Sequence, residues 1–172
     1  MDIKDLIQQR HSVRNFSDKK LSENMVYDLI KYANLAPSAG NLQARDFIIV
    51  DDHEVKEKLS VAALDQRFIV EAPVNIVVCA NLNRVSSYGQ SGRELYCVQD
   101  AAAAVEHILL LAVDNGLGSC WVGAFDEKQV SKILDLPSFV RPVAIIPIGY
   151  PKGDVVSTSR MDINALIHYN SW

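Results

Sequence analysis

The longest helical pattern of the chain, residues 94–115, places the strongest limit on how the protein can fold. It contains four alanines at positions 101–104 and, after a short polar interval, an apolar run at 108–113. Apolar residues lie on nearly all sides of this helical pattern, so neighbouring elements have to cover most of its surface. We therefore expect the chain to pack around this helix. The alanines suit close approach of another helix, either within the chain or across a subunit interface.

Apolar periodicity and turn residues predict the elements on either side of this helix. Helical patterns cover residues 2–10, a segment capped by Ser22 that stops before Pro37, a segment starting at 51–52, residues 66–72, and a segment capped by Asp126. Strand patterns cover 47–50, 74–80, 119–125 and 142–149, whereas 81–93 has the composition of a loop. Residues 74–80 are apolar throughout, which predicts a strand buried on both faces. This order of elements favours one domain, residues 1–172, of the α+β class with a mixed β-sheet flanked by helices.

Charge and composition exclude several classes of partner. The net charge is −4 and basic residues form no cluster, so we expect no nucleic-acid partner. The beginning of the chain lacks the basic and apolar pattern of a signal peptide, and no apolar stretch reaches the roughly 20 residues of a membrane span. We therefore expect a cytoplasmic protein without a membrane partner. The tail up to Trp172 nevertheless keeps apolar residues, so we expect it to pack against another surface.

The common catalytic signatures are absent from the sequence. The glycine-rich nucleotide-binding motifs and the Gly-x-Ser-x-Gly nucleophile motif do not occur. Three cysteines at wide spacings give no disulfide framework, and Cys120 beside Trp121 is interpreted as a buried structural thiol. Four histidines lack metal-ligand spacing, so no metal site is expected. A chain with a core but no acid–base set often leaves its chemistry to a cofactor.

Two polar segments are candidates for binding such a cofactor. The segment 10–14 carries two arginines and a serine, and these side chains suit the oxygens of a phosphate group. The alternative is that Arg10 interacts with the C-terminal end of the preceding helix. The segment 37–43 is rich in small and amide residues, with Gly40 free to adopt positive φ. Its alternative is an ordinary connecting loop.

Four segments together resemble the nitroreductase family. They are residues 10–16 (Arg-His-Ser-Val-Arg-Asn-Phe), 36–43 (Ala-Pro-Ser-Ala-Gly-Asn-Leu-Gln), 116–123 (Gly-Leu-Gly-Ser-Cys-Trp-Val-Gly), and 148–151 (Ile-Gly-Tyr-Pro) followed by Arg160. Each is modest alone, but the four occur in the family's order along essentially the whole chain. The resemblance implies an FMN-dependent, nitroreductase-like homodimer with a domain-swapped C-terminal segment and FMN at the subunit interface.

The resemblance also implies a set of cofactor-binding residues. Arg10 and Ser12 resemble the phosphate and ribityl ligands, and Arg14 resembles the cation near N1 and O2 of the flavin. Arg160 resembles a second phosphate contact. The other residues implied are His11 and Val13 in the first segment; Pro37, Ser38 and Asn41 in the second, contributed by the other subunit; and Gln43, Val122, Gly123, Ala124 and Gly149. No side chain is expected to be catalytic, because N5 of the flavin carries the chemistry.

The implied activity is an NADH- or NADPH-dependent oxidoreductase that passes electrons by a ping-pong mechanism to a small acceptor such as a nitroaromatic, a quinone or a flavin. Two alternatives stay open: a flavin-binding storage or sensor protein without turnover, and a flavin-fragmenting or dehalogenating member of the superfamily. Larger members carry a helical insertion over the substrate cleft where this chain has residues 81–93. The acceptor, and whether this segment acts as a lid, are therefore open.

Overall fold

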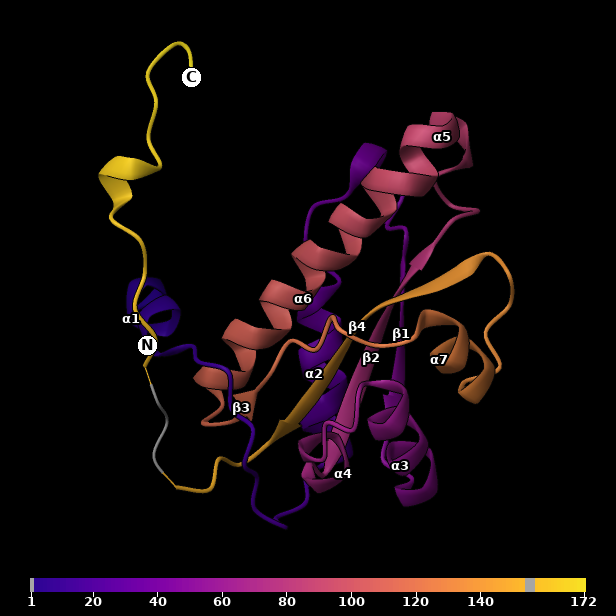
Figure 1. Cartoon of the computed structure of the whole chain (residues 1–172), viewed down its shortest axis with the longest axis vertical. Coiled ribbons are helices and arrows are strands. Elements are labelled where there is room, and N and C mark those ends of the chain that lie inside the picture. Colours follow the sequence, from indigo (N-terminus) through magenta and orange to yellow (C-terminus); the bar gives the residue numbers. More distant parts are fainter. Residues whose placement is uncertain (1, 154–156) are drawn as a thin grey trace.

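The computed structural model describes residues 2–153 and 157–172 and shows a β-sheet between two layers of helices (Figure 1). The strands are β1 (Arg45–Val50), β2 (Val74–Asn81), β3 (Gly118–Ser119) and β4 (Val140–Gly149). The helices are α1 (Ile3–Gln9), α2 (Glu23–Ala33), α3 (His53–Ala62), α4 (Phe68–Glu71), α5 (Gly89–Ser91), α6 (Cys97–Asp114) and α7 (Glu127–Ile133). These elements confirm the predicted α+β class.

The sheet has the strand order β1-β2-β4-β3, and every neighbouring pair is antiparallel. The prediction of a mixed sheet is therefore wrong for the described residues of one chain, whose named strands pair only in the antiparallel direction. A parallel bridge does occur outside these strands, between Ser12 and Ser119. The physical reason is that an unbroken apolar run reports burial on both faces of a strand. It does not report the direction of the neighbouring strand.

Alternate residues of β2 face the two helical layers. Ile76 and Val78 belong to the core cluster shared with α2 and α6, whereas Val77 and Cys79 belong to the cluster on the side of α3, α4 and α7. All eight residues of β2 are buried, which confirms the expectation for residues 74–80. The alternation follows from the two-residue period of a strand.

Helix α6 is the central helix of one layer. Ala101 and Ala104 are fully buried in the cluster that α6 shares with α2 and the sheet, so these alanines serve packing within the chain. The helical stretch Ser86–Asp114 is long and apolar enough, by length and composition alone, to cross a membrane, contrary to the expectation that no stretch is. Within the chain, 44% of its apolar window is buried, where α6 packs against α2, β2 and β4.

Local capping signals are confirmed at several helix ends. Ser22, Asp52 and Asp126 accept hydrogen bonds from backbone N–H groups in the first turns of α2, α3 and α7. After α6, Gly116 adopts φ +68°, which is the left-handed conformation that closes a helix at a glycine. These signals lie within a few residues of the ends they specify.

The prediction of a loop at 81–93 is wrong for most of the segment. Residues Ser86–Tyr88 form a 3-10 turn, followed by α5 and by a π-type turn at Gly92–Tyr96 that continues into α6 (Figure 1). Glycine and serine made the composition look like that of a loop. At position 92, however, glycine serves packing, because a Cβ there would lie 2.5 Å from the carbonyl oxygen of Val85.

The C-terminal tail lies apart from the helical layers (Figure 1). All residues from 157 to 172 are exposed, and the apolar side chains of this segment find no cover within the chain. The exposed large apolar residues are Met161, Ile163, Leu166, Ile167, Tyr169 and Trp172. The surface against which the tail was expected to pack is therefore not supplied by the described residues of the same chain.

Candidate functional site

The segment after α1 is held in an extended conformation against the sheet. The backbone N–H of Val13 donates to the carbonyl oxygen of Ser119 at 2.9 Å, and Phe16 pairs with Pro151 just after β4. In an extended chain successive side chains point to opposite sides. Val13 accordingly points into the core, while Ser12 and Arg14 are exposed on the other side.

The exposed side of this segment forms one wall of a cleft with a volume of about 460 Å³. The chain just after β4 and the beginning of the tail complete the lining. The lining residues are Arg10, His11, Ser12, Val13, Arg14, Asn15, Pro151, Lys152, Gly153, Thr158 and Arg160. The structure thus brings Arg160 to the segment 10–14, although about 150 residues of sequence separate them.

The cleft is strongly positive. Four of its lining residues carry permanent positive charge (Arg10, Arg14, Lys152 and Arg160), and none of the described lining residues is acidic. The chain as a whole has a net charge of −4, so this concentration of cations runs against its overall balance. Guanidinium groups, a serine hydroxyl and an ammonium group are the donors that bind phosphate oxygens. The arrangement fits a ligand that carries a phosphate group.

Two side chains, Phe68 and Cys120, lie next to Arg14 and Ser12. The guanidinium of Arg14 lies 5.9 Å from the ring centroid of Phe68 in α4, within the range of a cation–π contact. Burial raises the pKa of the Cys120 thiol, while nearby Arg14 and Ser12 act in the opposite direction. Cys120 is buried, in agreement with its interpretation as a structural thiol.

The predicted loop residues Pro37, Ser38, Asn41 and Gln43 lie at the other end of α6. The loop is bonded to Asp100, near the beginning of α6, whereas the cleft lies beside β3, beyond the end of that helix. From Asp100 to Asp114 the helix rises about 21 Å at 1.5 Å per residue. The loop and the cleft of one chain therefore do not form one site.

The loop itself has an unusual backbone. Gly40, Asn41 and Gln43 have φ values of +56°, +55° and +51°, and the Ser38 hydroxyl accepts a hydrogen bond from the N–H of Gln43 at 3.0 Å. Positive φ at Gly40 agrees with the prediction from sequence. Asparagine tolerates positive φ at position 41, but positive φ is strained for Gln43, and such strain is concentrated at functional sites.

The remaining predicted site residues lie outside the cleft. Val122 is buried and pairs with Ile145 of β4, while Gly123 and Ala124 are exposed in the turn that follows. Gly149 is buried at the end of β4, where a Cβ would lie 2.6 Å from Cδ of Pro73. Gly149 therefore serves close packing in the structure, and only the turn 123–124 is accessible to a ligand.

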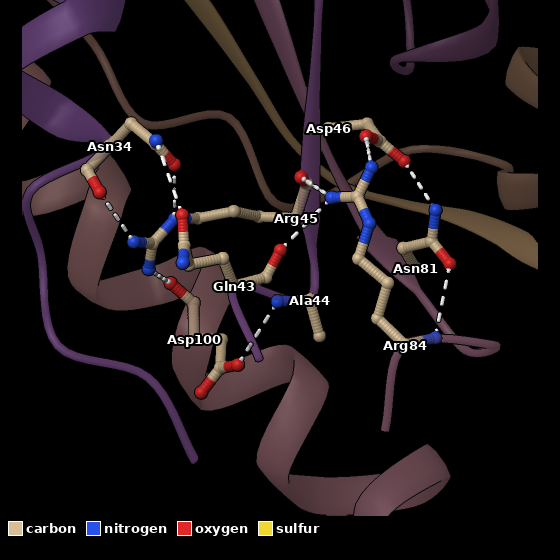
Figure 2. Close-up of polar contacts among 8 residues, drawn as sticks. All are labelled: Asn34, Gln43, Ala44, Arg45, Asp46, Asn81, Arg84 and Asp100. Carbon is tan, nitrogen blue, oxygen red and sulfur yellow. Dashed lines mark hydrogen bonds and ion pairs between the residues drawn. The ribbon is translucent and has the colours of Figure 1, made fainter. Parts of the chain in front are cut away.

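Sequence reasoning missed Lys152 in the cleft and two buried charged residues behind the loop, Arg45 and Asp100 (Figure 2). The sequence contained only a weak indication that these residues matter. Asp100 directly precedes the alanines of α6, and a charged residue at the edge of an apolar helix is buried only when partners satisfy it. The described residues contain no group of histidine, cysteine or acidic side chains that could hold a metal ion.

Comparison with protein families gives a match over most of the chain. The model of the nitroreductase family matches residues 7–67 and 60–150. A protein of Archaeoglobus fulgidus, named as an NADH dehydrogenase/NAD(P)H nitroreductase, is 36% identical over 153 residues, covering 87% of this chain and 85% of its own length. An NADPH-dependent oxidoreductase of Staphylococcus aureus is 31% identical over 97% of this chain and 72% of its own length.

Solved structures show the same architecture. The structure of NfrA2 from B. megaterium superposes with a TM-score of 0.93 at 28% identity, and the match covers all of this chain and 75% of that chain. A structure from Parabacteroides distasonis, named for NADH dehydrogenase/NAD(P)H nitroreductase, superposes with a TM-score of 0.89 at 27% identity and covers 99% of that chain. Both the longer and the shorter relatives therefore share the whole fold.

Proposed function

Because the chain belongs to the nitroreductase family, we propose that it is an FMN-dependent NAD(P)H oxidoreductase. The observation that supports FMN most directly is the cleft at residues 10–14, with four cations and no acid among its described lining residues. A phosphate dianion is the part of FMN that such a cleft can bind. The names of the relatives support NADH or NADPH as the reductant.

Each part of the cleft has a defined task in this proposal. Arg10 and Arg160 bind the phosphate, and the Ser12 hydroxyl donates to a phosphate or ribityl oxygen. Arg14 would hold the edge of the flavin ring, where a fixed cation would stabilise negative charge on the N1–O2 side. Bound FMN supplies the redox chemistry between NAD(P)H and an electron acceptor. The protein orients the reactants, and no side chain has to transfer a proton.

A homodimer is part of the same proposal. The loop 37–43 and the cleft lie at opposite ends of α6, so a cofactor that meets both has to lie between two chains. Apolar side chains exposed on a single chain also favour partners: Ile3 and Ile7 on α1, and Leu166, Ile167 and Trp172 in the tail. Apolar surface of this extent is typical of an interface. The tail is proposed to pack on the partner chain.

The first test is the visible spectrum of the purified protein, followed by anaerobic titration with NADH and NADPH. Rapid bleaching of bound flavin is expected and identifies the reductant. If reductant and acceptor bind in turn at the same face of the flavin, double-reciprocal plots of the steady-state rate give parallel lines, which is the pattern of a ping-pong mechanism. Bound flavin that neither nucleotide reduces favours the storage or sensor alternative. Breakdown of flavin in the presence of oxygen favours the flavin-fragmenting alternative.

The phosphate assignment is tested by Arg10→Ala. Loss of one hydrogen bond to a charged group, about 1.5 kcal/mol or more, weakens the Kd for FMN by at least roughly tenfold. Arg141→Ala is the matched control, because Arg141 forms an exposed ion pair with Glu127 at 2.7 Å, away from the cleft. Equal FMN affinity of Arg10→Ala and the control would show that the cleft does not bind the phosphate.

A further inference from the structure

Asp100 joins the two ends of the loop 37–44 through a single carboxylate. Its Oδ1 accepts the backbone N–H of Ala39 at 2.9 Å, and its Oδ2 accepts the backbone N–H of Ala44 at 3.3 Å. Asp100 is only 4% exposed and lies in the first turn of α6 (Figure 2). A buried carboxylate in this position fixes the distance between the beginning and the end of the loop.

Arg45 holds the chain that enters the loop. Arg45 is 2% exposed, and all three nitrogens of its guanidinium donate hydrogen bonds. Nη2 donates to the carbonyl oxygens of Asn34 at 2.8 Å and Ala36 at 2.6 Å. Nη1 donates to the carbonyl oxygens of Pro37 and Asp100, both at 3.2 Å, and Nε donates to Oδ1 of Asn34 at 3.3 Å. The five N–H groups of an arginine are thereby all used.

The two residues depend on each other electrostatically. The acceptors around Arg45 are neutral oxygens, and the negative charge that offsets its burial comes from Asp100. Burial lowers the pKa of Arg45, and the charge of Asp100 acts in the opposite direction. Removal of either charge leaves the other buried with less compensation.

The loop needs such support because its own backbone is strained. Gln43 adopts a positive φ of +51°, and such a strained conformation persists only where surrounding contacts fix it. The loop is also held from its other side, where Nη1 of Arg84 donates to the carbonyl oxygens of Gln43 and Arg45 (Figure 2). Meanwhile the side chains of Pro37 and Asn41 are exposed and serve no packing within the chain. Contacts buried behind the loop thus keep an exposed, strained surface in one shape.

We propose that Asp100 and Arg45 are positioning residues that preorganise the loop 37–44 for binding FMN in the partner subunit. This inference rests on the proposed function. Neither residue contacts the ligand; each acts through the backbone of the loop. Preorganisation raises affinity because the loop does not have to be ordered when the ligand binds.

The test combines Asp100→Asn with two measurements on the full-length protein. Asparagine keeps the shape and one acceptor oxygen, but its NH₂ group cannot accept the N–H of Ala44. Hydrogen exchange at the amides of Ala39 and Ala44, measured without flavin, is expected to become at least about tenfold faster. The Kd for FMN is expected to rise on the order of tenfold. Asp52→Asn is the control, because Asp52 accepts a backbone N–H at 2.9 Å in α3 and asparagine caps helices equally well.

A double-mutant cycle separates positioning from general destabilisation. Asn41→Gly removes an exposed side chain of the loop, and glycine adopts the positive φ at this position without strain. If Asp100 acts through the loop, the effects of Asp100→Asn and Asn41→Gly on FMN affinity are not additive, whereas Asp100→Asn and Arg10→Ala are additive. Should Asp100→Asn fail to fold, Arg45→Lys takes its place, since a lysine has three donors where five are needed.

The outcomes distinguish this inference from the proposed function. Faster exchange at Ala39 and Ala44 with unchanged FMN affinity overturns the positioning role and leaves the FMN proposal intact. Additive effects of Asp100→Asn and Asn41→Gly overturn it as well. A wild-type protein that binds no FMN, or that binds it without dependence on Arg10, overturns both.

Discussion

Gly118 sets how closely the segment 10–14, which we propose binds phosphate, approaches the sheet, and Gly118→Ala is the sharpest perturbation of that contact. A Cβ at position 118 would lie 2.7 Å from Cβ, Cγ1 and Cγ2 of Val13, whereas ordinary contacts begin at 3.4 Å. Val13 therefore has to retreat by about 0.7 Å, the difference between these two distances. Rotation of the side chain does not relieve the contact, because Cβ of Val13 is itself too close.

The retreat affects both stability and binding. The hydrogen bond from the N–H of Val13 to the carbonyl oxygen of Ser119 is 2.9 Å long, and displacement of Val13 away from β3 lengthens and weakens it. Together with overpacking, this lowers the free energy of unfolding by about 2 kcal/mol. Ser12 and Arg14 move with Val13, and the loss of one charge-assisted bond weakens the Kd for FMN by roughly tenfold.

Both effects can be measured on the same samples. Urea unfolding gives the free energy of unfolding, and quenching of flavin fluorescence gives the Kd. The double variant Val13→Ala/Gly118→Ala removes two of the three close contacts, so it should regain part of the lost affinity. If Gly118→Ala is as stable as the wild type and binds FMN equally well, the segment 10–14 is not positioned by its contact with β3.

Two further substitutions test local features. Gly40→Ala places a residue with a Cβ at φ +56°, which costs about 1 kcal/mol and lowers Tm by roughly 3 °C in calorimetry. A Cβ at position 40 would also lie 2.6 Å from the hydroxyl oxygen of Tyr88. The double variant Tyr88→Phe/Gly40→Ala, which lacks that oxygen, should therefore be less destabilised than Gly40→Ala alone. An unchanged Tm in both variants would argue against backbone strain at Gly40. Glu127→Gln tests the exposed ion pair between Glu127 and Arg141. The hydrogen bond from Arg141 lowers the pKa of Glu127 below its ordinary value of 4.5. The pair therefore stabilises the fold fully above pH 4.5, and this contribution is lost as the pH falls through the lowered pKa. Because both side chains are half exposed, we expect a loss of only about 0.5 kcal/mol at pH 7, which decreases as the pH falls through the lowered pKa of Glu127. A loss that does not change with pH in urea titrations would contradict the ion-pair account.

The parts of the fold that depend on neighbouring residues were predictable from the sequence. Ser22, Asp52 and Asp126 cap helices whose first turns lie within three residues of them. The strand β2 was predictable because burial on both faces requires an unbroken apolar run. Strand direction was not, since the partners of β2 lie far away in sequence and either direction buries the same side chains.

The candidate site divides in the same way. Segment 10–14 and Arg160 were expected from the family resemblance, and the structure brings them to one cleft. Asp100 was missed because its bonds to Ala39 and Ala44 span 61 and 56 positions of the sequence. Arg45 was missed because most of its partners, although only 8 to 11 positions away, are backbone carbonyl oxygens, which no residue type marks in a sequence. In a single sequence, Asp100 and Arg45 each look like an ordinary charged residue next to apolar residues. Their relation depends on how α6 lies against the loop, which no local pattern specifies.

The charge of the cleft has a consequence at distances beyond contact. Removing its four positive charges from the total of −4 leaves −8 on the rest of the chain, so the molecule is strongly polarised. An anionic ligand is attracted toward the cleft while the rest of the chain carries net negative charge, and such an arrangement raises the rate of productive encounters. Salt weakens this guidance, because at physiological ionic strength it extends only about 8 Å. The cleft thus sorts approaching molecules by charge first, and only the arginine donors inside it then distinguish one anion from another.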